Sequence, residues 1–172
     1  FATEKTLQSS TIYFDIKNSV WWKEMLDFIG VSENQLPRLM DSGKLVGEYK
    51  GIKIATSAMD QVAGAIGAGV VKPGIVSEMT GTTMAVFVPT DKAPAYVEGS
   101  KIPCHMNYDG NYALLIFSAT AGMALKWFKN NFCEEFSFRQ LDEMAEKVAP
   151  GSDGLVFLPY LCGSTMPKYD PA

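Results

Sequence analysis

Apolar side chains recur every three or four residues in three segments of the chain, which is the spacing of a helix with one buried face. The first segment ends at Gly30, the second begins near Thr120, and the third covers residues 138–148 before Pro150 and Gly151. Glycine and proline at such ends stop a helix because one favours non-helical backbone and the other lacks an amide hydrogen. A fourth helix is predicted directly after Asp60, where glycines and alanines allow close backbone approach.

Short runs of β-branched and aromatic residues predict strands between these helices. The runs cover residues 11–16, 53–56, 75–79, 84–88, 112–117 and 155–158, and the last is expected to be a buried strand. The polar residues 80–83 join two of the strands as a hairpin. Residues 89–110 are rich in Pro, Gly, Asp and Lys and predict an irregular loop or ragged edge strands. Through the middle of the chain the order is strand, strand, strand, helix.

Composition limits the classes of function. With 172 residues, 47% of them hydrophobic and 20% charged, the chain is ordinary globular material for one or two compact domains. Fifteen basic against 19 acidic residues give a net charge of −4, which argues against nucleic acid as a partner. No apolar run approaches the roughly 20 residues that cross a bilayer, so we expect no membrane span. The chain begins at Phe1 without the features of a signal peptide and reads like a piece of something longer.

The cysteines and the one histidine predict little chemistry. Cys104, Cys133 and Cys162 are scattered and form no C-x-x-C pair, so neither a disulfide framework nor a metal site is expected, and a reducing cytoplasm fits best. His105 is expected to be a plain surface or loop residue. Its neighbour Cys104 would point to the opposite face of any strand that holds both, which makes a Cys/His nucleophile pair geometrically poor.

Two glycine-rich patterns fail as nucleotide motifs. Gly69 and Gly74 have the spacing of a P-loop, but Ile75 and Val76 stand where the lysine and the Ser or Thr are required. The pair Gly67 and Gly69 lacks the third glycine of a dinucleotide fingerprint. A Walker site is therefore excluded, and NAD binding has no support.

Two other features have both a functional and a purely structural interpretation. In the hairpin Thr80-Gly81-Thr82-Thr83, backbone amides and hydroxyls could converge on phosphate oxygens, although such a turn is common as a bare hairpin. Asp60, where a strand signal gives way to a helix, could present its carboxylate to a crevice, although an aspartate there is more often a helix cap. The two features lie about 20 residues apart, and together they suggest a shared site.

A family resemblance joins these features. From Met59 to Thr83 the chain reads Met-Asp-Gln-Val-Ala-Gly-Ala-Ile-Gly-Ala-Gly-Val-Val-Lys-Pro-Gly-Ile-Val-Ser-Glu-Met-Thr-Gly-Thr-Thr. This resembles the FGGY carbohydrate kinases, closest to their xylulokinase branch, which have an Asp-Gln pair, an Ala-Gly-Ala helix, a Pro-Gly turn and a strand ending in Gly-Thr-Ser or Gly-Thr-Thr. Residues 10–17 with Trp22 resemble a segment late in the family's first domain. Residues 150–163 and 167–171 resemble its P-G-x-D-G-L-x-F-L-P-Y-L-x-G segment and the W-D-P that follows.

The resemblance implies an α/β protein of ribonuclease H-like, actin-like ATPase fold. Residues 1–72 would be the C-terminal part of the sugar-binding N-terminal domain, and residues 73–172 the N-terminal part of the ATP-binding C-terminal domain. Asp60 matches the general base that removes a proton from the sugar hydroxyl, and Gln61 matches a position that often helps to hold the sugar. Gly81, Thr82 and Thr83 match the second phosphate loop, which holds the β- and γ-phosphates of ATP.

The implied activity is ATP- and Mg²⁺-dependent phosphorylation of a sugar hydroxyl, on a pentulose such as D-xylulose, in the cytoplasm. A first phosphate loop, an early sugar-contacting segment and a later adenosine segment are missing, so we expect these residues alone to be incomplete for activity. Met59 also replaces the family's usual glycine. Two alternatives stay open: a kinase for another polyol or sugar acid, and a noncatalytic actin-like binding or assembly module. Association of two copies as a homodimer is also left open.

Overall fold

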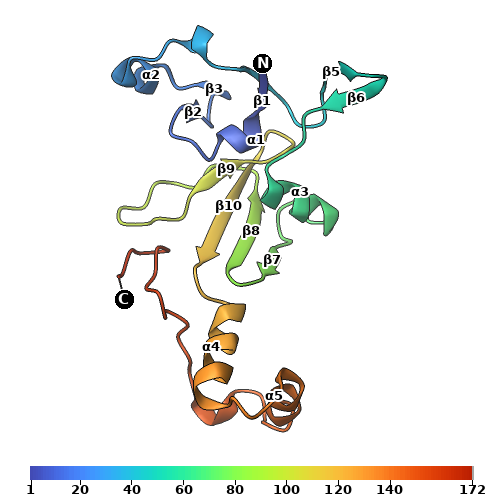
Figure 1. Cartoon of the computed structure of the whole chain (residues 1–172). Coiled ribbons are helices and arrows are strands. Elements are labelled where there is room, and N and C mark those ends of the chain that lie inside the picture. The colour runs from blue at the N-terminus through green and yellow to red at the C-terminus, as the bar shows by residue number, and fades with distance from the viewer. Residues whose placement is uncertain (172) are drawn as a thin grey trace. The chain divides into compact units, whose positions relative to one another are not determined.

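The computed structural model describes residues 1–171, and the contacts within the chain divide it into two compact units (Figure 1). The first unit comprises residues 1–78, 86–98 and 102–116. The second comprises residues 79–85, 99–101 and the chain from residue 117 onward. The domain boundary expected between residues 72 and 73 follows the family pattern and stays a prediction, because the contact units divide the chain at other positions.

Short strands and helices open the first unit. In chain order these elements are β1 (Ala2–Glu4), α1 (Lys5–Gln8), β2 (Phe14–Asp15), β3 (Val20–Trp21), α2 (Lys23–Ile29), η1 (Glu33–Gln35) and β4 (Arg38–Met40). β1 pairs in parallel with β4, and β2 pairs antiparallel with β3. Gly30 ends α2 as predicted, with φ at 71° in the left-handed region. The predicted strand at residues 11–16 shrinks to the two residues of β2, and α1 was not predicted.

Trp21 and Trp22 take different roles. Trp21 lies in β3, is buried, and packs edge to face on Phe14 with the ring centroids 6.4 Å apart. Trp22 is the residue before α2 and is 40% exposed. α2 therefore begins only after both rings, because the chain is still extended at Trp21.

A ribbon and a helix follow. β5 (Leu45–Tyr49) and β6 (Ile52–Ala55) form an antiparallel ribbon whose residues are all exposed. α3 (Asp60–Gly67) begins where the sequence predicted a helix. Its buried face consists of Val62 and Ala65, which lie three residues apart on one side of the helix. This face belongs to the main apolar cluster, which contains Met59, Val62, Ala65, Val70, Phe87 and Ala113.

A four-stranded sheet contains the strands predicted in the middle of the chain. Its order is β7 (Ser77–Thr80), β8 (Met84–Thr90), β10 (Tyr112–Ser118) and β9 (Cys104–Met106) (Figure 1). β9 pairs antiparallel with β10, and Met106 lies opposite Tyr112. Residues 91–103 contain no helix or strand, as the loop composition predicted. β7 and β8 are joined by residues 81–83, so the predicted hairpin is confirmed.

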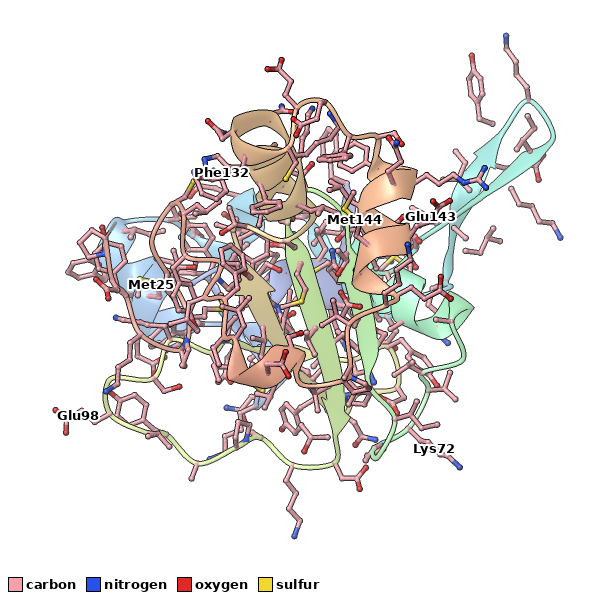
Figure 2. The ribbon with its side chains drawn as sticks, turned by 90° about the horizontal axis from the view of Figure 1, so that it is seen from below. Met25, Lys72, Glu98, Phe132, Glu143 and Met144 are labelled. Carbon is pink, nitrogen blue, oxygen red and sulfur yellow. The ribbon has the colours of Figure 1, made fainter. Side chains whose placement is uncertain are left out.

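Helices dominate the second unit. α4 (Gly122–Phe132) and α5 (Phe138–Ala145) are followed by the short helix η2 (Ser152–Gly154). Ser137 and Gln140 form a capping box at the start of α5, with each side chain bonded to the backbone amide of the other residue. Figure 2 labels Phe132 at the end of α4 and Met144 on α5, both of them exposed. No helix in residues 1–171 is long and apolar enough to cross a bilayer.

Two expectations about burial are wrong. Residues 155–158 form no strand, and their side chains are 58–80% exposed. His105 lies in β9 and is only 6% exposed, so it is a buried residue and not a surface residue. In both cases the burial depends on contacts with distant parts of the chain, which the local sequence does not indicate.

Candidate functional site

Asp60 is the first residue of α3. Met59 precedes it as the N-cap, so Asp60 lies one position inside the helix and is not itself the cap. Its Oδ1 accepts a hydrogen bond from the amide of Gln61 at 2.8 Å, and the side chain is exposed. Within residues 1–171, Oδ2 has no hydrogen-bond or ion-pair partner. The carboxylate therefore has one oxygen held by the helix and one oxygen open to a ligand.

Gln61 follows on the first turn of α3 and is partly buried. Its backbone amide holds Asp60, while its side-chain amide forms no hydrogen bond with any other described residue. A free side-chain amide offers both donors and an acceptor, which is the chemistry that a polyhydroxylated ligand requires. Asp60 and Gln61 thus present a carboxylate and an amide from consecutive positions at one end of a helix.

The loop of Gly81, Thr82 and Thr83 is fastened to the start of α4 in the second unit. The carbonyl of Thr82 accepts from the amides of Ala121 and Met123 at 3.1 and 3.3 Å, and the carbonyl of Gly81 accepts from the amide of Gly122 at 3.0 Å. These bonds satisfy donors that the first turn of a helix otherwise leaves open. The amide end of α4 therefore lies directly against the loop.

The donors of this loop differ from those expected for a phosphate site. The amide of Gly81 bonds to the carbonyl of Thr83 at 2.8 Å and is used within the turn. Thr82 is exposed and Thr83 is partly buried, and their hydroxyls form no hydrogen bond within the described chain. The hydroxyls of Thr82 and Thr83 can donate to an anionic phosphate, whereas the first amides of α4 are already bonded to the loop carbonyls.

Gly122 permits the close approach of loop and helix. A Cβ built on Gly122 would lie 2.5 Å from the carbonyl oxygen of Gly81, well inside van der Waals contact. Sequence reasoning missed this residue, because a glycine at the start of a helix gives no signal of which backbone it faces. Asp60 belongs to the first unit and the loop to the second, so their approach across a shared cleft stays a prediction.

Buried His105 does not form a nucleophile pair with Cys104. Its Nδ1 lies 3.4 Å from the hydroxyls of both Ser9 and Ser10, and its Nε2 has no partner within the described residues. Burial lowers the pKa of His105 and raises the pKa of the Cys104 thiol, so both stay neutral. The Cys104 sulfur contacts the carbonyl of His105 at 3.9 Å and not its ring.

The side chains of residues 1–171 contain no cluster of three or more His, Cys, Asp or Glu that could hold a metal ion. The arrangement described above therefore consists of a carboxylate and amide on α3 and a hydroxyl-bearing loop at α4. One is suited to accept a proton from a polyol, and the other to hold an anion.

Comparisons with known proteins find similar sequences. Residues 1–69 match the FGGY family of carbohydrate kinases, N-terminal domain. Xylulose kinase of Lactococcus lactis subsp. lactis (strain IL1403) is 28% identical over 181 residues, covering 98% of this chain and 36% of the relative. Gluconokinase of Bacillus subtilis (strain 168) is 26% identical over 192 residues, covering 99% of this chain and 37% of the relative.

The fold is shared with a solved structure. Ligand-bound xylulose kinase from Lactobacillus acidophilus has a TM-score of 0.88 and 23% identity, covering 99% of this chain and 37% of the other. This likeness shows a shared fold, and the mixed helices and strands confirm the predicted α/β class. The chain is similar to the FGGY family of carbohydrate kinases over residues 1–69, and to the two relatives over 98–99% of its length. It spans about a third of the length of the curated relatives that it matches.

Proposed function

We propose that this chain supplies the catalytic base and a phosphate-binding loop of an ATP-dependent sugar kinase. The observation that carries the proposal is the state of Asp60, an exposed carboxylate at a helix start with Oδ2 open to a ligand. In this proposal Asp60 and Gln61 contact the sugar, and Gly81, Thr82 and Thr83 hold the β- and γ-phosphates of ATP.

Phosphoryl transfer requires an in-line nucleophile and neutralised charge more than it requires covalent catalysis. The sugar hydroxyl oxygen forms a bond to the γ-phosphorus, the bond from that phosphorus to the bridging oxygen breaks, and ADP leaves. Asp60 accepts the hydroxyl proton, which a neutral alcohol must lose to form the phosphate ester. The Thr82 and Thr83 hydroxyls orient the phosphate oxygens, and Mg²⁺, when bound with the nucleotide, would supply charge neutralisation.

A pentulose such as D-xylulose is the proposed acceptor. Xylulose kinases stand among the similar proteins at 28% identity, but a gluconokinase stands at 26%, so another polyol or a sugar acid is the competing acceptor. Gln61 can donate or accept toward either, since its side-chain amide offers both functions. The compartment we propose for the reaction is the cytoplasm.

A noncatalytic role in binding or assembly has one observation in its favour. The bond from the Gln61 amide to Asp60 Oδ1 is one that a carboxylate at a helix start makes without any catalytic duty. This interpretation assigns no role to Oδ2, the oxygen of Asp60 that is open to a ligand. Sugar-dependent ATP hydrolysis or transfer separates the two interpretations directly.

The decisive experiment compares Asp60→Asn with Asp27→Asn in the longest natural polypeptide that contains these residues. Asp27 is an exposed carboxylate on α2 paired with Lys23, so its variant controls for loss of a surface charge. We expect Asp60→Asn to retain sugar binding by calorimetry and to lose about 10²- to 10⁴-fold in kcat. Near-normal turnover of Asp60→Asn, or equal losses in both variants, would remove Asp60 as the base.

A further inference from the structure

The carboxylate of Glu4 is buried at the start of α1 and is surrounded by donors. Its Oε1 accepts from the amide of Thr6 at 2.9 Å and from the hydroxyl of Ser42 at 2.8 Å. Its Oε2 accepts from the hydroxyl of Thr6 at 2.6 Å and from the amide of Leu7 at 3.0 Å. A buried carboxylate is costly unless its oxygens are satisfied, so these four bonds fix Glu4 in one orientation.

Thr6 transmits this orientation to α3. Its hydroxyl has a single proton, which it donates to Glu4, so its lone pairs are left to accept. The amide of Met59 donates to that oxygen at 2.8 Å, across 53 positions of sequence, and Thr6 is almost fully buried. The direction of both hydrogen bonds is therefore set by the carboxylate.

Met59 is the N-cap of α3 and makes no side-chain cap of its own. Its side chain lies in the main apolar cluster, and the hydroxyl of Ser10 contacts its sulfur at 3.1 Å. The backbone amide and the side chain of Met59 are thus held by different parts of the first unit. Asp60 is the next residue, and its direction follows from the backbone that Met59 fixes.

We propose that Thr6, oriented by Glu4, is a positioning residue for Asp60. The hydroxyl of Thr6 holds the N-cap amide of α3 and so sets the direction in which the Asp60 carboxylate leaves the helix. The inference rests on the proposed role of Asp60 as the base. A displacement of about 1 Å at a reacting group can cost about 10²-fold in rate, so an anchor one residue away has a measurable effect.

The variants Thr6→Val and Thr6→Ser separate the hydroxyl from the shape of the side chain. Valine retains the branched shape and removes the hydroxyl, whereas serine retains the hydroxyl. Thr11→Val is the matched control, because the Thr11 hydroxyl bonds to the carbonyl of Gln8 and does not contact α3.

The first measurement is amide hydrogen exchange on this chain and needs no activity. We expect the Met59 amide to exchange about tenfold faster in Thr6→Val, because a buried donor loses its acceptor. It should stay within about twofold of the parent in Thr6→Ser and Thr11→Val. The Ala63 amide, which bonds to the carbonyl of Met59 inside α3, reports general unfolding. Unchanged Met59 exchange, or equal acceleration at Met59 and Ala63, would overturn the anchor.

The second measurement is sugar phosphorylation by the longest natural polypeptide that contains the chain. We expect Thr6→Val to lower kcat about 10- to 100-fold with little change in the KM for sugar or ATP, and Thr6→Ser to restore kcat. Faster Met59 exchange with unchanged kcat would overturn the positioning role. If even the parent polypeptide fails to phosphorylate any sugar, the proposed function fails and the positioning role fails with it, while the exchange data still decide the anchor.

Discussion

Replacing Gly122 by alanine tests whether the loop at residues 81–83 is held by α4. The new methyl group would lie 2.5 Å from the carbonyl oxygen of Gly81 and 3.4 Å from its carbon. Both partners are backbone, so no flexible side chain can rotate away. Relief requires the loop to separate from the start of α4, and this strains or breaks the three hydrogen bonds donated by Ala121, Gly122 and Met123.

The magnitude follows from those contacts. Forcing a methyl group into occupied space costs about 1–3 kcal/mol, and each hydrogen bond lost costs about 0.5–1.5 kcal/mol net. Since the shift that relieves the clash also gives up part of the bonding, the two costs overlap. We expect the free energy of unfolding of the second unit to fall by about 2–4 kcal/mol.

The assay is hydrogen exchange by mass spectrometry, combined with urea unfolding followed through tryptophan fluorescence. Exchange should rise in peptides that cover residues 79–85 and 117–132 and stay unchanged in peptides that cover residues 59–70. Gly67→Ala is the control: the Gly67 Cβ position has no atom within 4 Å, and alanine there should be neutral or stabilise α3 by up to about 1 kcal/mol. Equal behaviour of the two variants would refute the claim that Gly122 fastens the loop.

Three further outcomes are expected. Thr82→Val should raise the KM for ATP about 10- to 100-fold in the longest natural polypeptide, because hydrogen bonds to charged acceptors are worth about 1.5–3 kcal/mol. Thr82→Ser, which retains the hydroxyl, should leave this KM unchanged. An unchanged KM in Thr82→Val would contradict the assignment of the loop to phosphate binding. Burial lowers the pKa of His105 below 6.5, so the unfolded chain binds the extra proton and urea midpoints should fall as the pH drops from about 6.5 toward the folded pKa. His105→Leu should lack that part of the decline, and an identical pH profile would argue against it. Phe157→Asp should change the free energy of unfolding by less than about 0.5 kcal/mol, since Phe157 is exposed, and a loss of several kcal/mol would show that it is buried.

Local signals predicted the elements that surround the candidate site. Local sequence signals mark three of these elements: the helix after Asp60, the hairpin at residues 80–83 and the helix α4. The structure places each of them within about two residues of the prediction. α3 lies where its small residues and its apolar pair, Val62 and Ala65, allow a buried face. These elements depend on neighbours in sequence, which is why the pattern alone indicated them.

The supports of the site depend on contacts that are distant in sequence. Thr6 and Met59 are 53 positions apart, and nothing in a threonine at a short helix indicates which amide it accepts. The proximity of Gly122 to Gly81 is equally invisible until both backbones are placed. His105 was misjudged for the same reason, since strand pairing with Ala113 and contact with Ser9 and Ser10 bury a residue type that is usually intermediate.

Residues 155–158 have the local composition of a strand, but they form no strand in the structure. A strand is stabilised by hydrogen bonds to a neighbouring strand, and none pairs with these residues in the described chain. The second unit also buries no large apolar side chain among its described residues, since its buried apolar residues are Ala85 and Ala124. The curated relatives are almost three times as long as the part of them that matches this chain. An apolar run forms a strand only where another strand is available to pair with it, so the β preference of residues 155–158 alone does not specify a strand.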